Sequence, residues 1–330
     1  MNRALLDPAD LYSRSLSLPS ALEVVARSLG HAIDHDALCA AMGLSFMLCC
    51  PHNDEPLCHW PMFARDAFLP EAARLFGMEI REIHPPEAAH GLSGMREFDQ
   101  HFDASYKPLI RNALRHGQPV LAWRGWPDEH ELLWGRIQHE CAAGIGFAGS
   151  IFGRRGTEIA KELVLQTPPV QLYVVERTVP RIPKADELID GVLKHARCVL
   201  HNELGGRFDV ITGPQAYDEW IRRLDMASKD IDVPNAVVTE TAALATAVMA
   251  GHRSATRSLR RELATASKIH RGHCEKLLNV CEGVVAALTE LRDKTAVCEH
   301  GKTPAGRAFL LSRLSQARSA TVEPLGTAHE

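Results

Sequence analysis

The sequence has few of the features that mark membrane, exported or disulfide-bonded proteins. No run of apolar residues approaches the roughly 18 that a bilayer-spanning helix needs. The first residues, MNRALLDPADLYSR, carry acidic side chains where an export signal has an apolar core. The nine cysteines are an odd number and contain no CxxC pair, which disfavours a disulfide framework. We therefore expect a cytoplasmic protein with reduced thiols and no membrane partner.

Neither sign of charge is in large excess. Residues 1–180 hold 16 basic and 22 acidic side chains, and residues 181–330 hold 21 and 19. Neither half has the positive excess on which counterion release depends, so nucleic acid is not an expected partner. The glycine strings GIGFAG and FGRRG lack the spacing of a phosphate-binding loop, and we predict no nucleotide cofactor.

The composition is that of a globular protein, with 45% hydrophobic and 24% charged residues, and the length of 330 residues suggests about two domains. In the first half, helical spacing is found near residues 19–29, 36–42, 70–76 and 107–116. The strand-like segments of this half come later, and they are QPVLAW, ELLWGRI, GIGFAG and VQLYVVE. Helices first and strands later predict an α+β domain rather than a doubly wound sheet.

The second half has a helical pattern throughout. The segment TVPRIPKAD, with two prolines and mixed charge, is typical of a linker and predicts domains over 1–178 and 184–330. Helical spacing then recurs over residues 188–200, 214–226, 236–266, 274–291 and 304–322. The last helix begins with Thr303 as its cap and Pro304 at its first position. We expect an all-α domain whose long helices could supply the two-fold interface of a homodimer.

Ser17 stands before an apolar helix pattern that starts at Pro19 and closes at Gly30. In this register the segment resembles the first helix of papain-like cysteine peptidases of the bacteriocin-processing (double-glycine) type. It is equally similar to the amino-terminal family of butirosin biosynthesis protein H. In both, a cysteine, two further residues and a small-rich apolar helix end in a glycine thirteen positions after the cysteine. The resemblance places Ser17 at the position of the nucleophilic cysteine.

Further segments carry the same resemblance. The stretch from Gly43 to Gly77 looks like the loop and second helical region of these families, and HGQPVLAW with ELLWGRI looks like their strand pair. The resemblance covers about residues 11–175, and more loosely the AYDEW and HRSATRSLRRELA segments of the helical remainder. It implies helices packed on an antiparallel sheet, followed by a helical domain. It also implies an acyl or amide transferase of natural-product biosynthesis that acts on a carrier-bound thioester or a small amine.

Such chemistry needs a nucleophile at a helix amino terminus, a histidine and an orienting acid or amide. The resemblance implies the histidine at Leu133, just before Trp134, and the acidic partner near Gly149 and Ser150. None of these side chains titrates. The serine hydroxyl of Ser17 is a far weaker acid than a thiol, so it needs a well-placed base.

Two nearby histidines could supply that base. His130 and His139 flank the matching position, and a small slip in the strand alignment would bring one of them into place. The alternative for Ser17 is a plain helix cap, which is what serine most often does at this position of a helix.

A denser group of potential ligands follows the first helix. Zinc or another transition metal would accept its seven side chains, although their spacing matches no common zinc ribbon or finger. The alternative is that Cys39 and Cys49 are core, that His31 and His35 flank a helix start, and that the remaining side chains lie in a loop. Cys58 is in addition a candidate relocated nucleophile, with His52 or His59 as its base. The seven candidates are His31, His35, Cys49, Cys50, His52, Cys58 and His59.

Aromatic and basic side chains supply the candidates for binding. Trp60, Trp126 and Trp134 could line a cleft for an apolar or planar small molecule, or they could be core of the strand pair. Arg253 opens a run of arginines over 253–261 that could hold an acidic acyl carrier protein or a phosphopantetheine phosphate. The alternative for the arginines is a helix face in solvent.

These patterns leave two hypotheses. The first is a papain-like acyl or amide transferase whose substrate is a small molecule or an acyl carrier protein. The second is a non-catalytic protein on the same fold that binds a ligand, a metal or a partner. It predicts Ser17 buried as a cap. A later histidine pair, His270 and His273, is expected to be solvated on its helix.

Overall fold

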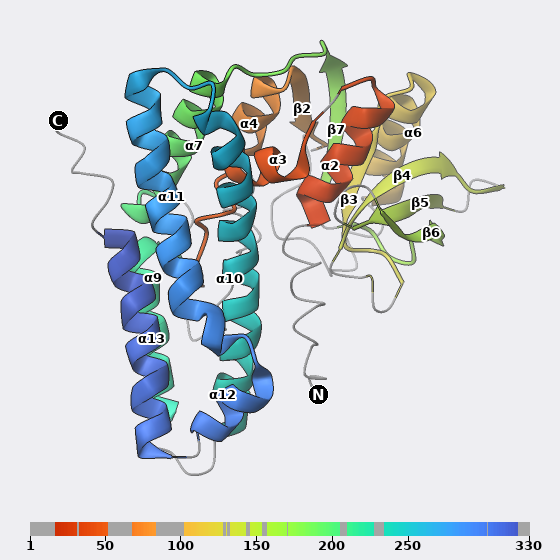
Figure 1. Cartoon of the computed structure of the whole chain (residues 1–330). Coiled ribbons are helices and arrows are strands. Elements are labelled where there is room, and N and C mark those ends of the chain that lie inside the picture. Colours follow the sequence, from red (N-terminus) through yellow and green to blue (C-terminus); the bar gives the residue numbers. More distant parts are fainter. Residues whose placement is uncertain are drawn as a thin grey trace. The chain divides into compact units, whose positions relative to one another are not determined.

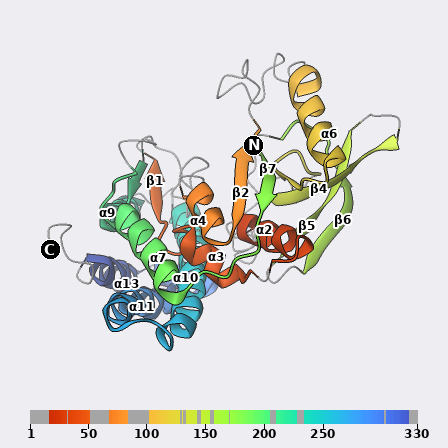
Figure 2. The ribbon, with the colours of Figure 1, turned by 90° about the horizontal axis from the view of Figure 1, so that it is seen from above.

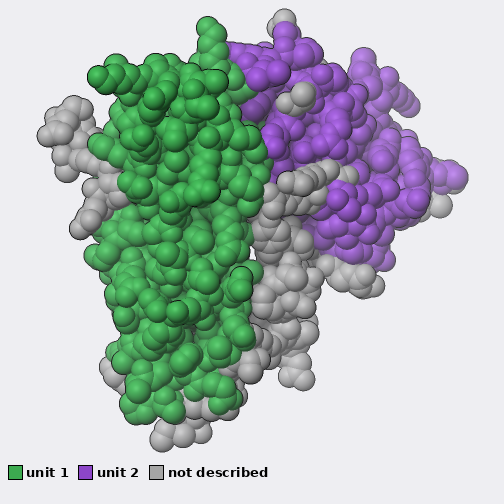
Figure 3. All heavy atoms as spheres, in the orientation of Figure 1, with its two compact units in different colours: residues 1–15, 36–72, 183–330 green, residues 16–35, 73–182 purple. Residues whose placement is uncertain are grey.

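The computed structural model describes most of the chain, in two compact units (Figures 1 and 3). The sheet unit comprises the described residues of 16–35 and 73–182, and the helical unit those of 36–72 and 183–330. No helix among the residues described is long and apolar enough to cross a membrane. The described residues are 17–31, 33–51, 68–83, 102–127, 130, 133–142, 146–153, 157–169, 171–204, 210–227, 234–301 and 303–322.

The sheet unit is built on six strands, and every neighbouring pair is antiparallel. Their order across the sheet is β2-β7-β3-β4-β5-β6. Short connections join β3 to β4, β4 to β5 and β5 to β6, as expected where antiparallel strands follow one another. The strands are β2 (Met78–Glu82), β3 (Val120–Trp123), β4 (Trp134–Glu140), β5 (Phe147–Phe152), β6 (Glu158–Val164) and β7 (Gln171–Thr178).

Helices cover both faces of this sheet (Figure 2). One face packs on the π-helical turn η2 (Phe102–Tyr106) and on α6 (Lys107–Arg115), through a core that includes Ile110, Val120 and Ile137. The other carries α2 (Ser17–Ser28), which packs against β4 and β5. Because side chains alternate along a strand, β4 contributes residues to both layers.

The helical unit is an assembly of long helices around one apolar core. Its centre is formed by residues such as Trp220, Val248, Val284 and Leu314, all buried. A two-stranded antiparallel sheet of β1 (Cys49–Pro51) and β8 (Val210–Thr212) joins this core through Leu48 and Cys50. The helices are α3 (His35–Ala41), α4 (Leu69–Leu75), α7 (Ala185–Leu200), α9 (Gly213–Ala227), α10 (Pro234–Leu263), α11 (Lys268–Leu288), η6 (Thr289–Leu291), α12 (Lys294–Gly301) and α13 (Pro304–Val322). The first residue of α3 and the last three of α4 fall in the sheet unit.

The structure is α+β, and the helices and strands predicted from sequence periodicity are present. The predicted cap of the last helix is confirmed, since the amide of Gly306 donates to Thr303 Oγ1 at 3.0 Å. The unit boundaries differ from the expected 1–178 and 184–330, because residues 36–72 belong with the helical unit. Residues 184–330 are not wholly helical either, since they contain β8, which pairs with β1.

Two glycines in neighbouring strands make room for a tryptophan. A Cβ added to Gly135 in β4 would lie 2.6 Å from the ring of Trp126, and one added to Gly149 in β5 would lie 2.9 Å from it. The Gly149 Cβ would also come within 2.1 Å of the backbone oxygen of Arg136. The Trp126 indole therefore lies flat on a side-chain-free patch of the sheet, and its Nε1 donates to the carbonyl of Ala122 at 3.3 Å.

This packing predicts that Gly149→Ala destabilises the protein strongly, because neither the strand backbone nor the buried indole can move aside. We expect a loss of about 1–3 kcal/mol or more in the free energy of unfolding, measured by chemical denaturation. Gly146→Ala is the matched control, since its Cβ would meet its nearest atoms only at 3.9 Å. Equal losses in the two variants would contradict this account of the indole.

Candidate functional site

Ser17 is the first residue of α2, and its side chain is a structural element of the sheet unit. The residue is only 2% exposed. Its Oγ accepts a hydrogen bond from the backbone amide of Trp134, the first residue of β4, at 3.1 Å. One hydroxyl thus satisfies a buried N–H of the strand and joins it to the beginning of the helix.

This contact puts Ser17 beside Trp134, the residue that follows the position implied for the histidine. Leu133, at the position implied for the histidine, immediately precedes Trp134 and is buried. The helix beginning and the strand beginning therefore meet where a nucleophile and its base would meet. A leucine side chain cannot take a proton, so this pair of positions has no acid–base chemistry of its own.

The position implied for the orienting acid is occupied by core residues. Gly149 faces the indole of Trp126, as described above. Ser150 is buried, and its hydroxyl donates to Gln138 Oε1 at 3.1 Å. Both residues lie in β5, and Ser150 is paired in register with Arg136 of β4. The two β5 positions thus build the sheet and carry no carboxylate.

The two alternative bases, His130 and His139, lie at different distances along the chain from Trp134, the residue that contacts Ser17. His139 follows Trp134 by five residues, roughly 16 Å along a strand, and it is half-exposed, with Nε2 3.6 Å from Glu162 Oε2. The structure therefore does not bring His139 to Ser17. His130 is half-buried in the turn before β4, where its carbonyl accepts from the amide of Leu133 at 3.0 Å. It is the one histidine of the pair that stays near the beginning of the strand.

The two described tryptophans among those proposed for binding, Trp126 and Trp134, lie on opposite faces of the sheet. Trp134 is buried on the face opposite Gly135 and stacks on Tyr173, with 5.3 Å between ring centroids. Trp126 covers Gly135 on the other face. Both are core residues of the sheet unit, and Trp60 lies outside the described residues.

The run of arginines on α10 is largely committed to partners within the helical unit. Arg257 forms a bidentate pair with Asp36 at 2.7 and 2.8 Å, and Arg260 pairs with Glu282 at 2.7 Å. Arg253 is half-buried on the same helix. The surface predicted to hold an acidic carrier is therefore less cationic than the sequence indicated.

The proposed metal ligands divide between the described and the undescribed parts of the chain. His52, Cys58 and His59 lie outside the described residues, so Cys58 as a nucleophile lies outside them too. Cys49 and Cys50 are neighbours in β1, where consecutive side chains point to opposite faces. His31 and His35 are both buried. Within the described ranges, no three His, Cys, Asp or Glu side chains are grouped so as to hold a metal ion.

A buried ion pair that the sequence did not reveal lies in the helical unit. Asp36, in the first turn of α3, is 4% exposed and accepts from Arg257 and from the hydroxyl of Ser254 at 2.5 Å. The carboxylate is fully satisfied by charge-assisted bonds, as a buried charge must be. The sequence gives no signal for a pair whose members lie 221 residues apart.

A second buried polar side chain, His195 of α7, holds the segment before α4. Its ring is fully buried and stacks on Phe68, with 4.1 Å between centroids. Its Nδ1 lies 2.5 Å from the carbonyl oxygen of Ala41, and its Nε2 lies 3.4 Å from Glu71 Oε2. Burial lowers the pKa of His195, and the two acceptors oppose that effect.

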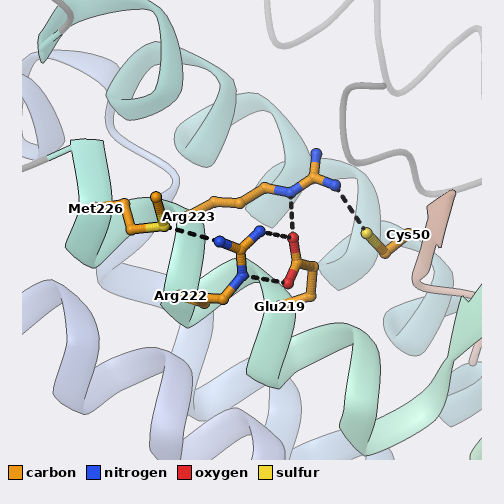
Figure 4. A network of polar contacts seen from close by, with 5 residues as sticks. All are labelled: Cys50, Glu219, Arg222, Arg223 and Met226. Carbon is orange, nitrogen blue, oxygen red and sulfur yellow. Dashed lines mark hydrogen bonds and ion pairs between the residues drawn. The ribbon is translucent and has the colours of Figure 1, made fainter. Parts of the chain in front are cut away.

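Cys50 belongs to a polar network on the side of α9 (Figure 4). Glu219 accepts from both Arg222 and Arg223, and Arg222 also approaches Met226 Sδ at 2.8 Å. Arg223 extends to Cys50 Sγ at 3.1 Å. Burial raises the pKa of the Cys50 thiol, while Arg223 acts in the opposite direction. The thiol is therefore a protonated packing residue at neutral pH rather than a reactive thiolate.

Compared with protein-family models and with curated protein sequences, the chain matches none.

The Asp36–Arg257 pair yields a prediction for stability. Asp36→Ala removes the buried acceptor shared by Arg257 and Ser254, and we expect the free energy of unfolding to fall by about 1.5–3 kcal/mol, because the Arg257 side chain itself is 36% exposed. Glu282→Ala, which breaks the exposed pair with Arg260, is the control and should cost about 0–1 kcal/mol. Both are measured by urea denaturation at pH 7. Similar small losses in the two variants would show that the buried pair is energetically ordinary.

The Glu219 network yields a prediction for pH dependence. The guanidinium groups of Arg222 and then Arg223 lower the pKa of Glu219 from 4.5 to about 2. A lowered pKa in the folded state means that the stabilisation is complete above pH 4.5 and is lost as the pH falls towards 2. We expect Glu219→Gln to be less stable than the wild type by about 1 kcal/mol at pH 6, because the ion pairs are partly exposed. Unfolding curves at several pH values test this, and a stability difference that does not shrink towards pH 2 would contradict it.

Proposed function

We propose that the chain is a papain-like protein of the butirosin-H type in which the residue at the nucleophile position is a structural hydrogen-bond acceptor for the neighbouring strand. It acts by binding an acyl thioester or a small amine, presented free or on a carrier protein, and not by covalent transfer at Ser17. One observation carries this proposal. The Ser17 hydroxyl is buried and accepts the amide of Trp134, while the neighbouring position 133, implied for the base, is leucine.

The physical argument rests on what a serine needs in order to react. A hydroxyl attacks a carbonyl only when a base removes its proton during the attack. The residue next to the Ser17 contact offers a hydrocarbon side chain, and the β5 positions offer a glycine and a serine that is bonded to Gln138. A helix beginning set against a strand beginning agrees with the resemblance, and the positions that the resemblance implies for the base and the acid carry no titrating side chain. Binding without turnover is the function that such an arrangement supports.

The second candidate function is acyl transfer by Ser17 with His130 as its base. It is favoured by the position of His130, whose carbonyl is bonded to the amide of Leu133 in the turn that leads to β4. Under this alternative, Ser17 forms an acyl ester that an amine then resolves.

Intact mass spectrometry with an acyl N-acetylcysteamine thioester separates the two functions. We predict no acyl adduct on Ser17 in the wild type, because the residue at position 133, implied for the base, is leucine and the Ser17 hydroxyl accepts the buried amide of Trp134. The double variant Ser17→Cys/Leu133→His restores the expected nucleophile and base, and we predict that it becomes acylated at position 17. Ser17→Cys alone is the matched control and should react at least about 100-fold more slowly, since it lacks the base. Circular dichroism establishes that each variant is folded.

A wild-type adduct on Ser17 that disappears in His130→Gln would overturn the proposal in favour of the transferase. Binding is tested with the unreactive thioether analogue of the same acyl group by calorimetry. We expect the wild type and the folded double variant to bind it alike. No measurable binding by the wild type would overturn the binding function.

A further inference from the structure

The amino terminus of α11 carries a serine that does not cap its helix. Ser267 is the residue before the first turn, and its side chain makes no hydrogen bond to the helix backbone. Its Oγ lies instead 2.7 Å from Nδ1 of His270, one turn further on. Ser267 is exposed, so the hydroxyl is open to solvent on its other side.

The second nitrogen of the same imidazole faces a carboxylate. His270 Nε2 lies 3.0 Å from Asp190 Oδ1, which α7 supplies. Because a carboxylate accepts, this contact favours the tautomer with its proton on Nε2 and leaves the Nδ1 lone pair for the serine hydroxyl. Ser267, His270 and Asp190 thus form a continuous serine–histidine–aspartate chain.

A second carboxylate fixes the serine backbone. Asp186, one turn before Asp190 on α7, accepts from the amide of Ser267 at 2.9 Å. Its other oxygen lies 3.4 Å from His270 Nδ1. The Ser267 amide is the main reason that the pKa of Asp186 lies below its usual range, and the Ser267 hydroxyl, which is within reach of both Asp186 and His270 Nδ1, lowers it further. The nucleophile and the base are therefore both anchored to α7.

The first turn of α11 supplies backbone N–H donors for an oxyanion, which acyl chemistry also requires. The amides of Lys268 and Ile269 donate to no residue that the structure describes, and they lie at the positive end of a helix of 21 residues. An oxyanion that forms on a carbonyl attacked by Ser267 develops beside these donors.

We propose that Ser267, His270 and Asp190 form a hydrolytic site for small uncharged carboxylic esters, independent of the Ser17 position. Asp186 and Asp190 repel anionic substrates, and Ile269, which is 73% exposed, offers an apolar surface next to the nucleophile. His270 is the base and Asp190 is a positioning residue that sets its tautomer.

The groups of the site, the ester and water account for every bond and proton of the reaction. Ser267 Oγ bonds to the ester carbonyl carbon as its proton passes to His270 Nδ1, and the carbonyl electron pair moves to the oxygen. Collapse of this intermediate breaks the carbon–oxygen bond, and the leaving alcohol takes the proton from Nδ1. Water then attacks the acyl-serine, with Nδ1 accepting its proton and returning it to Oγ, and the carboxylic acid is released.

The test is hydrolysis of p-nitrophenyl acetate by the full chain, followed by peptide mass mapping of the acetylated protein. We expect acetylation at Ser267 and turnover above the buffer rate. Ser267→Ala should abolish both, and His270→Gln should lower kcat by about 100-fold or more. Asp190→Asn should lower kcat while leaving KM unchanged, and it should alter the pH profile, which a merely structural role would not do. Ser315→Ala, an exposed serine on α13, is the control and should keep the wild-type rate.

Acetylation confined to Lys268 or other amines, or a rate that Ser267→Ala leaves unchanged, would overturn the site. Equal kcat values for the wild type and a folded His270→Gln variant would overturn it as well. Because this site shares no residue with the Ser17 position, its failure leaves the outcome of the thioester experiment untouched.

Discussion

One hydrogen bond joins the beginning of α2 to the beginning of β4 in the sheet unit: the Trp134 amide donates to the Ser17 hydroxyl. The amide is buried at the beginning of β4, and a buried N–H without an acceptor costs about 1–3 kcal/mol. Serine supplies that acceptor from the first residue of α2, so the helix beginning is set against β4, and the helix packs along β4 and β5. The rest of α2 is apolar on the packed side, with Leu18, Leu22 and Val25 buried.

The same bond gives the Ser17 hydroxyl a structural role at this position. A sulfur at residue 17 would be a poorer acceptor for the strand amide but a stronger acid and nucleophile. A serine hydroxyl supplies this acceptor without an easily formed anion. Nearby, Leu133 is buried in the core and Gly149 admits the Trp126 indole.

The sequence predicted the elements well because their signals are local. The apolar stripe of α11 and the proline and threonine at the beginning of α13 determine those helices directly. It did not predict β1 and β8, which are three residues long, or β6, an exposed edge strand with the polar sequence EIAKELV. Such segments become strands through their neighbours, and single-sequence patterns carry little of that information.

Residue groupings were harder to predict than elements. Ser17 could be placed at a helix beginning from the sequence, but its bond to Trp134 spans 117 residues. The Asp36–Arg257 pair and the approach of Asp190 to His270 are likewise tertiary contacts. The sequence marked His270 only as a histidine on a helix. Its partner, Asp190, lies on α7, and only the packing of α7 against α11 brings the two side chains together.

Hydrogen–deuterium exchange at the Trp134 amide tests the central claim most directly. With Ser17 Oγ as the acceptor, this amide should be strongly protected in the wild type. It should exchange at least about tenfold faster in a folded Ser17→Ala variant, while the amide of Ile137, further along β4, keeps its rate. Unchanged protection of the Trp134 amide in that variant would show that Ser17 is not the acceptor that joins α2 to β4.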